Sequence, residues 1–314
     1  MKKRSTAVGV LIITFIIILV VNLTGNKEET SANKLKADIT KVEENIDLVS
    51  DHSLGNMELT KEEREWLNQN TGKIANINDV QDFYGGNKVV DKDNLADSVD
   101  NSKNKYFPAI GNQGSIGSCA SWAMTYLQAS YTLNKARDLS GKDTKNVFSP
   151  MWTYNMTNEG GNNGTTLVDV YLVLDQIGAV SIEDVPAYTT VENKYQYGDL
   201  HAKDGLWLKA QDNKIDDAFM VEVGTEGDKT PVTSPDDEDL YAIKSLLNSG
   251  EILTCSSYAY KWKTETIKAN DEVPGNDDHV GEYIITRNDG YQYGGHRITI
   301  VGYDDNIWAD INKN

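Results

Sequence analysis

Cysteine and histidine are scarce in this chain of 314 residues, which contains two cysteines and four histidines. Two cysteines cannot build a disulfide framework, and no paired Cys or His spacing typical of a metal site is present. The sequence therefore implies no metal and no organic cofactor. Each cysteine, Cys119 and Cys255, needs an explanation of its own.

Basic residues are also few compared with acidic ones. The chain has 30 Lys and Arg residues against 48 Asp and Glu residues, which gives a formal net charge of -18. Because proteins that bind nucleic acid neutralise its phosphates with basic side chains, this balance argues against nucleic acid as a partner. No internal repeat is visible. The hydrophobic content of 39% is nevertheless sufficient for a real core.

The N-terminus combines a basic start, KKR, with an apolar run from Ala7 to about Leu23. This pattern predicts an export signal. The run is long for the core of a signal peptide and short for a typical spanning helix, so residues 1–25 are interpreted as either a signal peptide or a retained membrane anchor. Both alternatives place the rest of the protein outside the cytoplasm, secreted or held at the cell surface by an N-terminal transmembrane segment.

Residues 26–104 are polar and acidic. Apolar residues at alternating spacings of four and three predict an amphipathic helix between Leu35 and Val49. A second helix is predicted in LTKEEREWLNQNTG, where Thr60 and Glu63 fit a capping box. The segment is interpreted as a spacer, and a propeptide that covers an active site is the alternative.

The compact part, residues 105–314, divides into a helical part and a β part. Between about 105 and 190, patterns of buried helices occur in SCASWAMTYLQASYTLNKARD and GTTLVDVYLVLDQIGAV. From about 191 to 314, polar loops precede a helix in SPDDEDLYAIKSLLNSG and strand-like runs in EILTCSSYAY, GEYIITR and HRITIVGY. The predicted fold class is α+β.

Cys119 opens the first of these helices, directly after a turn, and Ser118 is the expected N-cap. A thiol in the first helical turn lies at the positive end of the helix dipole, which lowers its pKa and favours a nucleophile. Unpaired cysteine is also among the most buried residue types, so the position alone leaves nucleophile and packing residue both open. Cys255 lies in an apolar strand-like run and is interpreted as a core residue.

A catalytic thiolate needs an imidazole partner. His52 in the acidic segment and His201 in a charged loop are expected to be solvated. His296 is well placed to be the base, because it opens a strand-like run that would anchor the side chain as it projects into a cleft. His279 is flanked by turn residues and acids and stays as the alternative.

Four segments resemble those of the papain-like cysteine peptidases, in the order of that family. NQGSIGSCASWA is similar to its active-site signature, VFSPMWTYNMT to its serine-led helix, GGNNGTTLVDVYLVLDQIGAV to its glycine-rich substrate loop and following helix, and HRITIVGY to its histidine strand. The resemblance covers roughly Tyr106 to Asp305. It implies a two-lobed fold, in which an active-site cleft lies between a helical lobe and an antiparallel β-barrel-like lobe.

By this resemblance Cys119 is the nucleophile and His296 its base, and Gln113 forms the oxyanion hole together with the Cys119 backbone N–H. Asn163 and Gly164 are implied contacts for the backbone of an extended protein or peptide substrate. The implied reaction is peptide-bond hydrolysis through a thiolate–imidazolium pair and a thioester intermediate.

The sequence departs from the family at several points. Ile116 stands where many members carry a disulfide cysteine, and Ala120 stands where a tryptophan usually follows the nucleophile. No Asn-Ser-Trp-Gly segment follows the histidine strand, so the chain is expected to be truncated, with its last strands and the imidazole-orienting asparagine missing. The alternative is a catalytically silent surface protein that binds peptide or glycan. A third interpretation keeps the Cys–His pair with transglutaminase or amidase chemistry.

Overall fold

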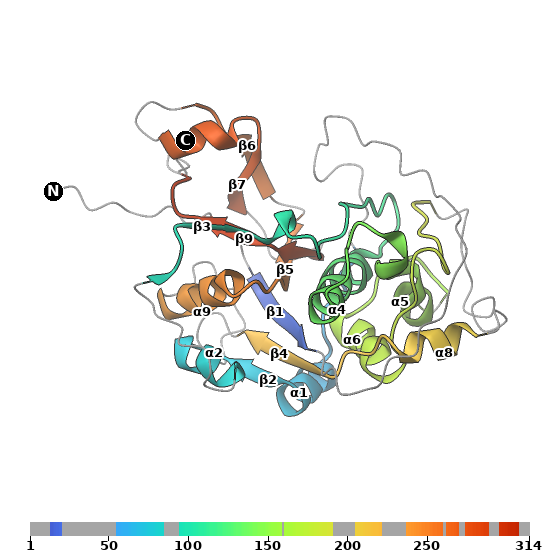
Figure 1. Cartoon of the computed structure of the whole chain (residues 1–314). Helices are drawn as coiled ribbons and strands as arrows, with labels where there is room; N and C mark the ends of the chain where they lie inside the picture. The colour runs from blue at the N-terminus through green and yellow to red at the C-terminus, as the bar shows by residue number, and fades with distance from the viewer. Residues whose placement is uncertain are drawn as a thin grey trace.

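The structure is a computed structural model of the whole chain (Figure 1). It describes residues 13–20, 55–84, 94–158, 160–190, 205–221, 237–259, 262–269, 274–288 and 295–307. The helix expected between Leu35 and Val49 lies outside the described residues, as do much of the polar loop region and the last seven residues.

The centre of the helical part is one long helix. It begins as α3 (Cys119–Ser121), continues as the π-helical η3 (Trp122–Ala129) and ends as α4 (Ser130–Arg137). Ala120 and Met124 are 0% exposed. A helix that is apolar around so much of its circumference must be covered by protein on several sides, as the sequence pattern predicted.

Two capped helices cover this central helix. For α5 (Pro150–Thr157), the Met151 N–H donates to Ser149 Oγ at 3.2 Å, which confirms the expected serine-led start. In α6 (Leu167–Gln176), the N-cap is Thr166. We call the region formed by α3 to α6 the helical half.

The main sheet has five strands in the order β2-β4-β1-β5-β8. Its strands β1, β4, β5 and β8 pair antiparallel with their neighbours, and only β2 pairs parallel, with β4. Their bounds are β1 (Ile13–Val20), β2 (Gly72–Ile74), β4 (Asp217–Val221), β5 (Leu253–Tyr258) and β8 (Gly295–Ile300). The runs EILTCSSYAY and HRITIVGY thus form the predicted strands.

Figure 1 shows this sheet between the helices α4, α5 and α6 on one side and α2 and α9 on the other. We call the five strands together with α2 and α9 the sheet half. The remaining helices are α1 (Lys61–Asn70), α2 (Ile77–Phe83), α8 (Leu206–Gln211), α9 (Asp237–Asn248) and the 3-10 turns η2 (Asn101–Lys103), η4 (Thr144–Asn146) and η7 (Pro274–His279). Two further antiparallel pairs are β3 (Ser98–Asp100) with β9 (Gly302–Asp304), and β6 (Trp262–Thr266) with β7 (Tyr283–Asn288).

Strand β1 differs from what the sequence predicted. The apolar run expected to serve as a signal or spanning helix contributes Ile13–Val20 to the middle of the sheet. Ile17 and Leu19 join the core of the helical half, while Ile18 joins the core under α2 and α9. A run that is apolar at nearly every position suits a strand covered on both faces, which explains the difference. Across the described ranges, no helix has the length and apolar character needed to cross a membrane.

The predicted capping box at α1 is present. The Thr60 N–H donates to Glu63 Oε2 at 2.7 Å, and the Glu63 N–H donates to Thr60 Oγ1 at 3.2 Å. The other oxygen of Glu63 accepts from the hydroxyl of Thr166 at 2.8 Å. The start of α1 is therefore bonded to the start of α6 in the helical half.

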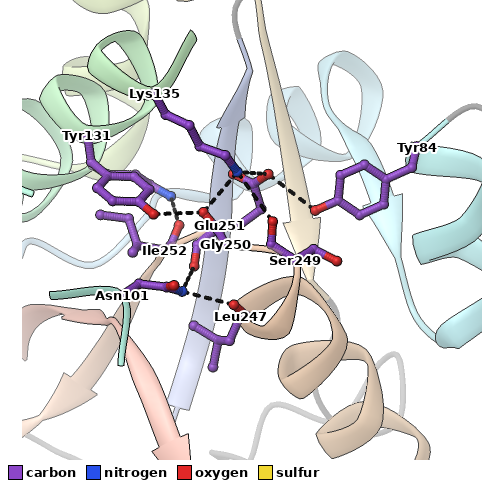
Figure 2. Close-up of polar contacts among 10 residues, drawn as sticks. Tyr84, Asn101, Tyr131, Lys135, Leu247, Ser249, Gly250, Glu251 and Ile252 are labelled. Carbon is purple, nitrogen blue, oxygen red and sulfur yellow. Dashed lines mark hydrogen bonds and ion pairs between the residues drawn. The ribbon is translucent and has the colours of Figure 1, made fainter. Parts of the chain in front are cut away.

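A polar cluster around Glu251 joins three parts of the chain (Figure 2). The Lys135 Nζ of α4 lies 2.7 Å from a carboxylate oxygen of Glu251, and the Tyr84 hydroxyl donates to the same oxygen at 3.2 Å. Asn101 donates to the Glu251 carbonyl at 2.8 Å, and the Tyr131 hydroxyl donates to the preceding carbonyl at 2.8 Å. Hydrogen bonds to Gly250 and Glu251, just before β5, thus connect the helical half with residues of the predicted spacer.

Candidate active site

Cys119 is the first residue of the long buried helix and is 1% exposed. Its sulfur accepts backbone hydrogen bonds from Arg297, Gly55 and Ala120. Ser118 occupies the N-cap position, but its hydroxyl makes no capping bond and has no partner among the described residues. The expectation that Ser118 caps this helix was therefore wrong.

Burial raises the pKa of the Cys119 thiol above its ordinary value. The backbone hydrogen bonds and the positive charge of Arg297 act in the opposite direction but do not overcome the loss of solvent. The net shift is opposite to the lowering expected from the helix dipole. The thiol is therefore neutral near pH 7 in this form of the protein.

His296 is the second residue of β8, directly before the residue whose N–H reaches the sulfur. Its ring packs edge-on against Trp262, with the ring centroids 6.5 Å apart, and the Trp262 indole donates to Ser257 Oγ at 3.1 Å. The imidazole Nδ1 is buried and has no hydrogen-bond partner in the described part of the chain. Burial and then the charge of Arg297 lower the pKa of His296 to about 4.

The structure brings Cys119 to the strand that carries His296, but on this strand the sulfur contacts Arg297. Successive side chains of a strand point to opposite faces. Arg297 shares its face with Thr299, which donates to the Ala123 carbonyl of the helical half at 3.4 Å. The Cys119–His296 pair stays a prediction, and in this form both groups are neutral near pH 7.

His279, the alternative base, lies at the end of η7 among acids. Its Nδ1 is 3.0 Å from Glu282 Oε2 and its Nε2 is 3.4 Å from Asp304 Oδ2. The hydrogen bond to Glu282, and then the other contacts with these two carboxylates, raise the pKa of His279. His52 and His201 lie outside the described residues.

The turn before Cys119 is held by an asparagine that the sequence did not single out. Asn162 Oδ1 accepts from the Gly117 N–H at 2.8 Å and from the Tyr154 hydroxyl at 2.9 Å. The Gln113 amide donates to the Ile116 carbonyl at 2.9 Å, inside the same turn. The loop GGNNG marked the region of Asn162, but only the fold shows which asparagine reaches the turn.

Residues 55–57, which we call the covering segment, cross from one half to the other beside Cys119. On the helical half, the Thr165 N–H donates to the Gly55 carbonyl at 3.0 Å and the Met57 N–H donates to the Thr165 carbonyl at 3.2 Å. On the sheet half, the Asn56 N–H donates to the Gly295 carbonyl at 3.2 Å. An extended backbone is therefore hydrogen-bonded on both of its sides.

Glycines allow this close approach. A Cβ on Gly55 would lie 1.9 Å from the Gly117 carbonyl oxygen, and a Cβ on Gly164 would lie 2.2 Å from the Gly55 carbonyl oxygen. Gly164 also has a φ of +103°, which glycine adopts most readily. Gly164 thus lies against the covering segment, while Asn163 is exposed beside it. Their roles as substrate contacts stay predictions.

Arg297 is the second residue that the sequence did not single out. Its side chain is 3% exposed, and its Nε and Nη2 donate to Asn56 Oδ1 at 3.1 and 2.6 Å. The sequence could have singled out Arg297 because it is a charged residue at an inward-facing position of the strand HRITIV. Cys255 is 0% exposed in the core, where burial raises its pKa to about 12. Within the described ranges, no group of three His, Cys, Asp or Glu side chains is arranged to hold a metal ion.

No family model matches the chain, and no curated protein matches it. Solved structures do. Xylellain, a cysteine protease from Xylella fastidiosa, is 18% identical, with 82% of this chain and 83% of that chain covered and a TM-score of 0.46. Digestive procathepsin L 3 of Tenebrio molitor larval midgut is 16% identical, with 77% and 64% covered and a TM-score of 0.41.

The proform of Amb a 11, a cysteine protease and ragweed pollen allergen, is 17% identical, with 77% and 62% covered and a TM-score of 0.39. The chain spans less than two thirds of the length of the procathepsin and of Amb a 11. The chain is thus similar to solved cysteine proteases at low identity, and its functional interpretation rests on the site itself.

Proposed function

We propose that this chain is a papain-like cysteine peptidase, closed by its own covering segment. One observation carries the proposal: an extended backbone lies beside the Cys119 sulfur and is hydrogen-bonded to Thr165 on the helical half and to Gly295 on the sheet half. Recognition through main-chain hydrogen bonds is how proteins hold extended peptides of varied sequence. A thiol placed beside such a bound backbone suits peptide-bond hydrolysis.

In this form the thiol lies beside the covering segment in an unreactive state. Gly55 donates its backbone N–H to the sulfur. The thiol is also buried, and its raised pKa keeps it protonated, whereas the thiolate is the reactive species. These contacts support the propeptide interpretation of residues 26–104 over the spacer interpretation.

Opening of the covering segment would restore solvent to both catalytic groups. The pKa of Cys119 would fall toward its ordinary value while the pKa of His296 would rise from about 4, because burial is the main cause of both shifts. The proton of the thiol can then pass to the imidazole. The thiolate–imidazolium pair that the sequence predicts therefore belongs to the open form.

In the proposed reaction, the Cys119 thiolate attacks the carbonyl carbon of the substrate, and the C=O π electrons move to the oxygen. The Cys119 N–H and the Gln113 amide stabilise this oxyanion, for which Gln113 exchanges its Ile116 partner. The oxyanion collapses, the C–N bond breaks, and His296 gives its proton to the leaving amine. Water, deprotonated by His296, then attacks the thioester and releases the acid and the thiol.

A catalytically silent protein that binds peptides is the second candidate function. It is favoured by the contacts of the sulfur, which are with backbone N–H groups of Arg297, Gly55 and Ala120. It is also favoured by His296, whose Nδ1 has no partner among the described residues. Both candidates use the same bound backbone and differ only in whether Cys119 reacts.

We also propose that the protein is exported, on the basis of the basic start and the apolar run that follows it. The same run supplies β1, so an exported chain keeps it as a strand, retains it in the membrane as an anchor or loses it by cleavage as a signal peptide. Membrane fractionation of expressing cells, with sequencing of the mature N-terminus, separates these outcomes. Recovery only in the cytoplasm would contradict export.

The peptidase proposal is tested by labelling the full chain with a peptidyl epoxide and locating the adduct by mass spectrometry. We expect Cys119 to be labelled, at a rate that Leu208→Ala, at an exposed position of α8, leaves unchanged and His296→Ala greatly reduces. Cys255 is the internal control, because it is 0% exposed. Labelling of Cys255 without Cys119 would contradict the proposal, and loss of labelling only in His279→Ala would move the base to His279.

A further inference from the structure

A buried cation lies at the point where the covering segment contacts β8. Arg297 is 3% exposed, and two of its nitrogens donate to one oxygen, Oδ1 of Asn56. The third, Nη1, is buried and has no hydrogen-bond partner among the described residues. The covering segment therefore provides an acceptor for two of the guanidinium nitrogens but not for Nη1.

This arrangement is costly for a charge. Burial lowers the pKa of Arg297 to about 10, so the guanidinium is still positive near pH 7. The nearby Cys119 and Cys255 thiols have raised pKa values and are neutral there, and Asn56 is a neutral amide. Buried charges are ordinarily paired with a counter-charge. No carboxylate of the described residues is recorded in contact with Arg297.

Asn56 is held there as a peptide residue is held in a binding site. Its backbone N–H donates to the Gly295 carbonyl, and its side chain turns to Arg297. Gly295 and Arg297 are two residues apart on β8 and share a face. A Cβ on Gly295 would lie 3.1 Å from Asn56 Nδ2 and 2.7 Å from the Asn56 carbonyl oxygen. Gly295 thus leaves room for the residue whose side chain Arg297 contacts.

We propose that Gly295 and Arg297 form a side-chain subsite that selects a substrate residue with a carboxylate or carboxamide, and that Asn56 is its internal occupant. This proposal rests on the peptidase function proposed above. A carboxylate brings a counter-charge and two oxygens, which match the planar donor fork of Arg. The expected order of preference is Asp or Glu, then Asn or Gln, then an apolar residue, which would leave the cation unpaired.

The first test uses matched peptidyl epoxides that carry Asp, Asn or Leu at either of the two residues next to the reactive carbon. Each probe is added to the full chain, and the rate of Cys119 labelling is followed by mass spectrometry. Every probe requires the covering segment to open in the same way. The ratio of the Cys119 labelling rates of two probes is therefore independent of the opening step. We expect Asp to label on the order of tenfold faster than Leu at one of the two positions.

The second test changes the residues themselves. In Arg297→Glu we expect the preference to reverse, so that a Lys probe labels faster than the Asp probe. Since a change at a buried Arg can prevent folding, Asn56→Asp and Asn56→Leu provide an independent measurement with iodoacetamide. Asn56→Asp should slow labelling of Cys119 and Asn56→Leu should speed it, while Leu208→Ala, at a position 77% exposed and outside the covering segment, should not change it.

The outcomes separate this inference from the proposed function. Equal rates for the Asp and Leu probes, or a faster Leu probe, would overturn the subsite while leaving the peptidase proposal standing. The same holds if Asn56→Asp and Asn56→Leu change the iodoacetamide rate equally. If no peptidyl probe labels Cys119 but the Asn56 variants shift the iodoacetamide rate in opposite directions, the subsite stands and the peptidase proposal fails.

Discussion

The two halves of the molecule differ in how their parts are distributed along the sequence. The helical half comes from one stretch of chain, from α3 to α6, whereas the sheet half takes its strands from positions between residue 13 and residue 300. The central strand of the sheet half, β1, and the covering segment both come from N-terminal residues. The helical half is therefore a local scaffold for Cys119, and the sheet half depends on segments that the sequence marks as a signal and a spacer.

The halves also differ in their electrostatics at the site. The helical half presents a neutral group, the Ala120 N–H, to the sulfur. The sheet half presents a buried cation and a histidine whose pKa burial lowers to about 4. Burial is nevertheless the main cause of the pKa shifts of both Cys119 and His296, and the charge of Arg297 has a smaller effect.

The largest expected effect comes from breaking the sheet half at β1. Ile18 is 1% exposed between β4 and β5, so Ile18→Ala should lower the free energy of unfolding by about 2–5 kcal/mol. Urea unfolding followed by circular dichroism measures this. Leu208→Ala, at a position 77% exposed, is the control and should change it by less than about 0.5 kcal/mol. An Ile18→Ala protein as stable as the control would show that β1 contributes nothing to the sheet.

The pH dependence of stability tests the electrostatic difference. Because the pKa of His296 falls from 6.5 to about 4 on folding, its neutral form stabilises the fold fully above pH 6.5, and this contribution is lost as the pH falls through 4. The contribution is about 3 kcal/mol. Unfolding free energies between pH 7 and pH 4 should therefore decline less in His296→Gln than in the unchanged protein.

His279 provides the opposite sign as a control for this measurement. Its pKa is raised, first by Glu282, so its contribution is present below its ordinary pKa and is lost as the pH rises through the raised value. His279→Gln should therefore not flatten the decline below pH 6. If it flattens the decline and His296→Gln does not, the assignment of the buried neutral histidine is wrong.

A smaller effect is expected where the two halves are joined. In Glu251→Gln the partly buried partner of Lys135 loses its charge, and we expect a loss of about 1–3 kcal/mol in the free energy of unfolding. The exposed pair of Lys61 and Glu65 is the matched control, and Glu65→Gln should cost less than about 0.5 kcal/mol. Equal losses in both variants, measured by urea unfolding, would mean that the Glu251 cluster does not tie the halves together.

The smallest effect compares two serines that precede helices of the helical half. Ser149 accepts the Met151 N–H, so Ser149→Ala should cost about 1 kcal/mol in the free energy of unfolding. Ser118 makes no capping bond, and Ser118→Ala should therefore cost less than that. Thermal unfolding of the two variants measures the difference. A larger loss in Ser118→Ala would restore the cap that the sequence predicted for the Cys119 helix.

Local signals in the sequence predicted most of the helical half. The serine before α5 and the capping box of Thr60 and Glu63 act over three residues or fewer, so they can be read without the fold. The strand-like runs of β5, β7 and β8 were also predicted from their β-branched residues. Which strands neighbour one another could not be predicted, because pairing depends on segments hundreds of residues apart.

By itself, the sequence determined that the chain is an α+β protein with an acidic surface, a cysteine at the start of a buried helix and a histidine at the start of a strand. The tertiary structure decided the environment of these groups. Burial is the main cause of the raised pKa of Cys119, and the approach of Asn56 to Arg297 supplies the acceptor for the buried cation. Solvent exclusion and long-range contacts are properties of the packed molecule, and no local pattern of residues records them.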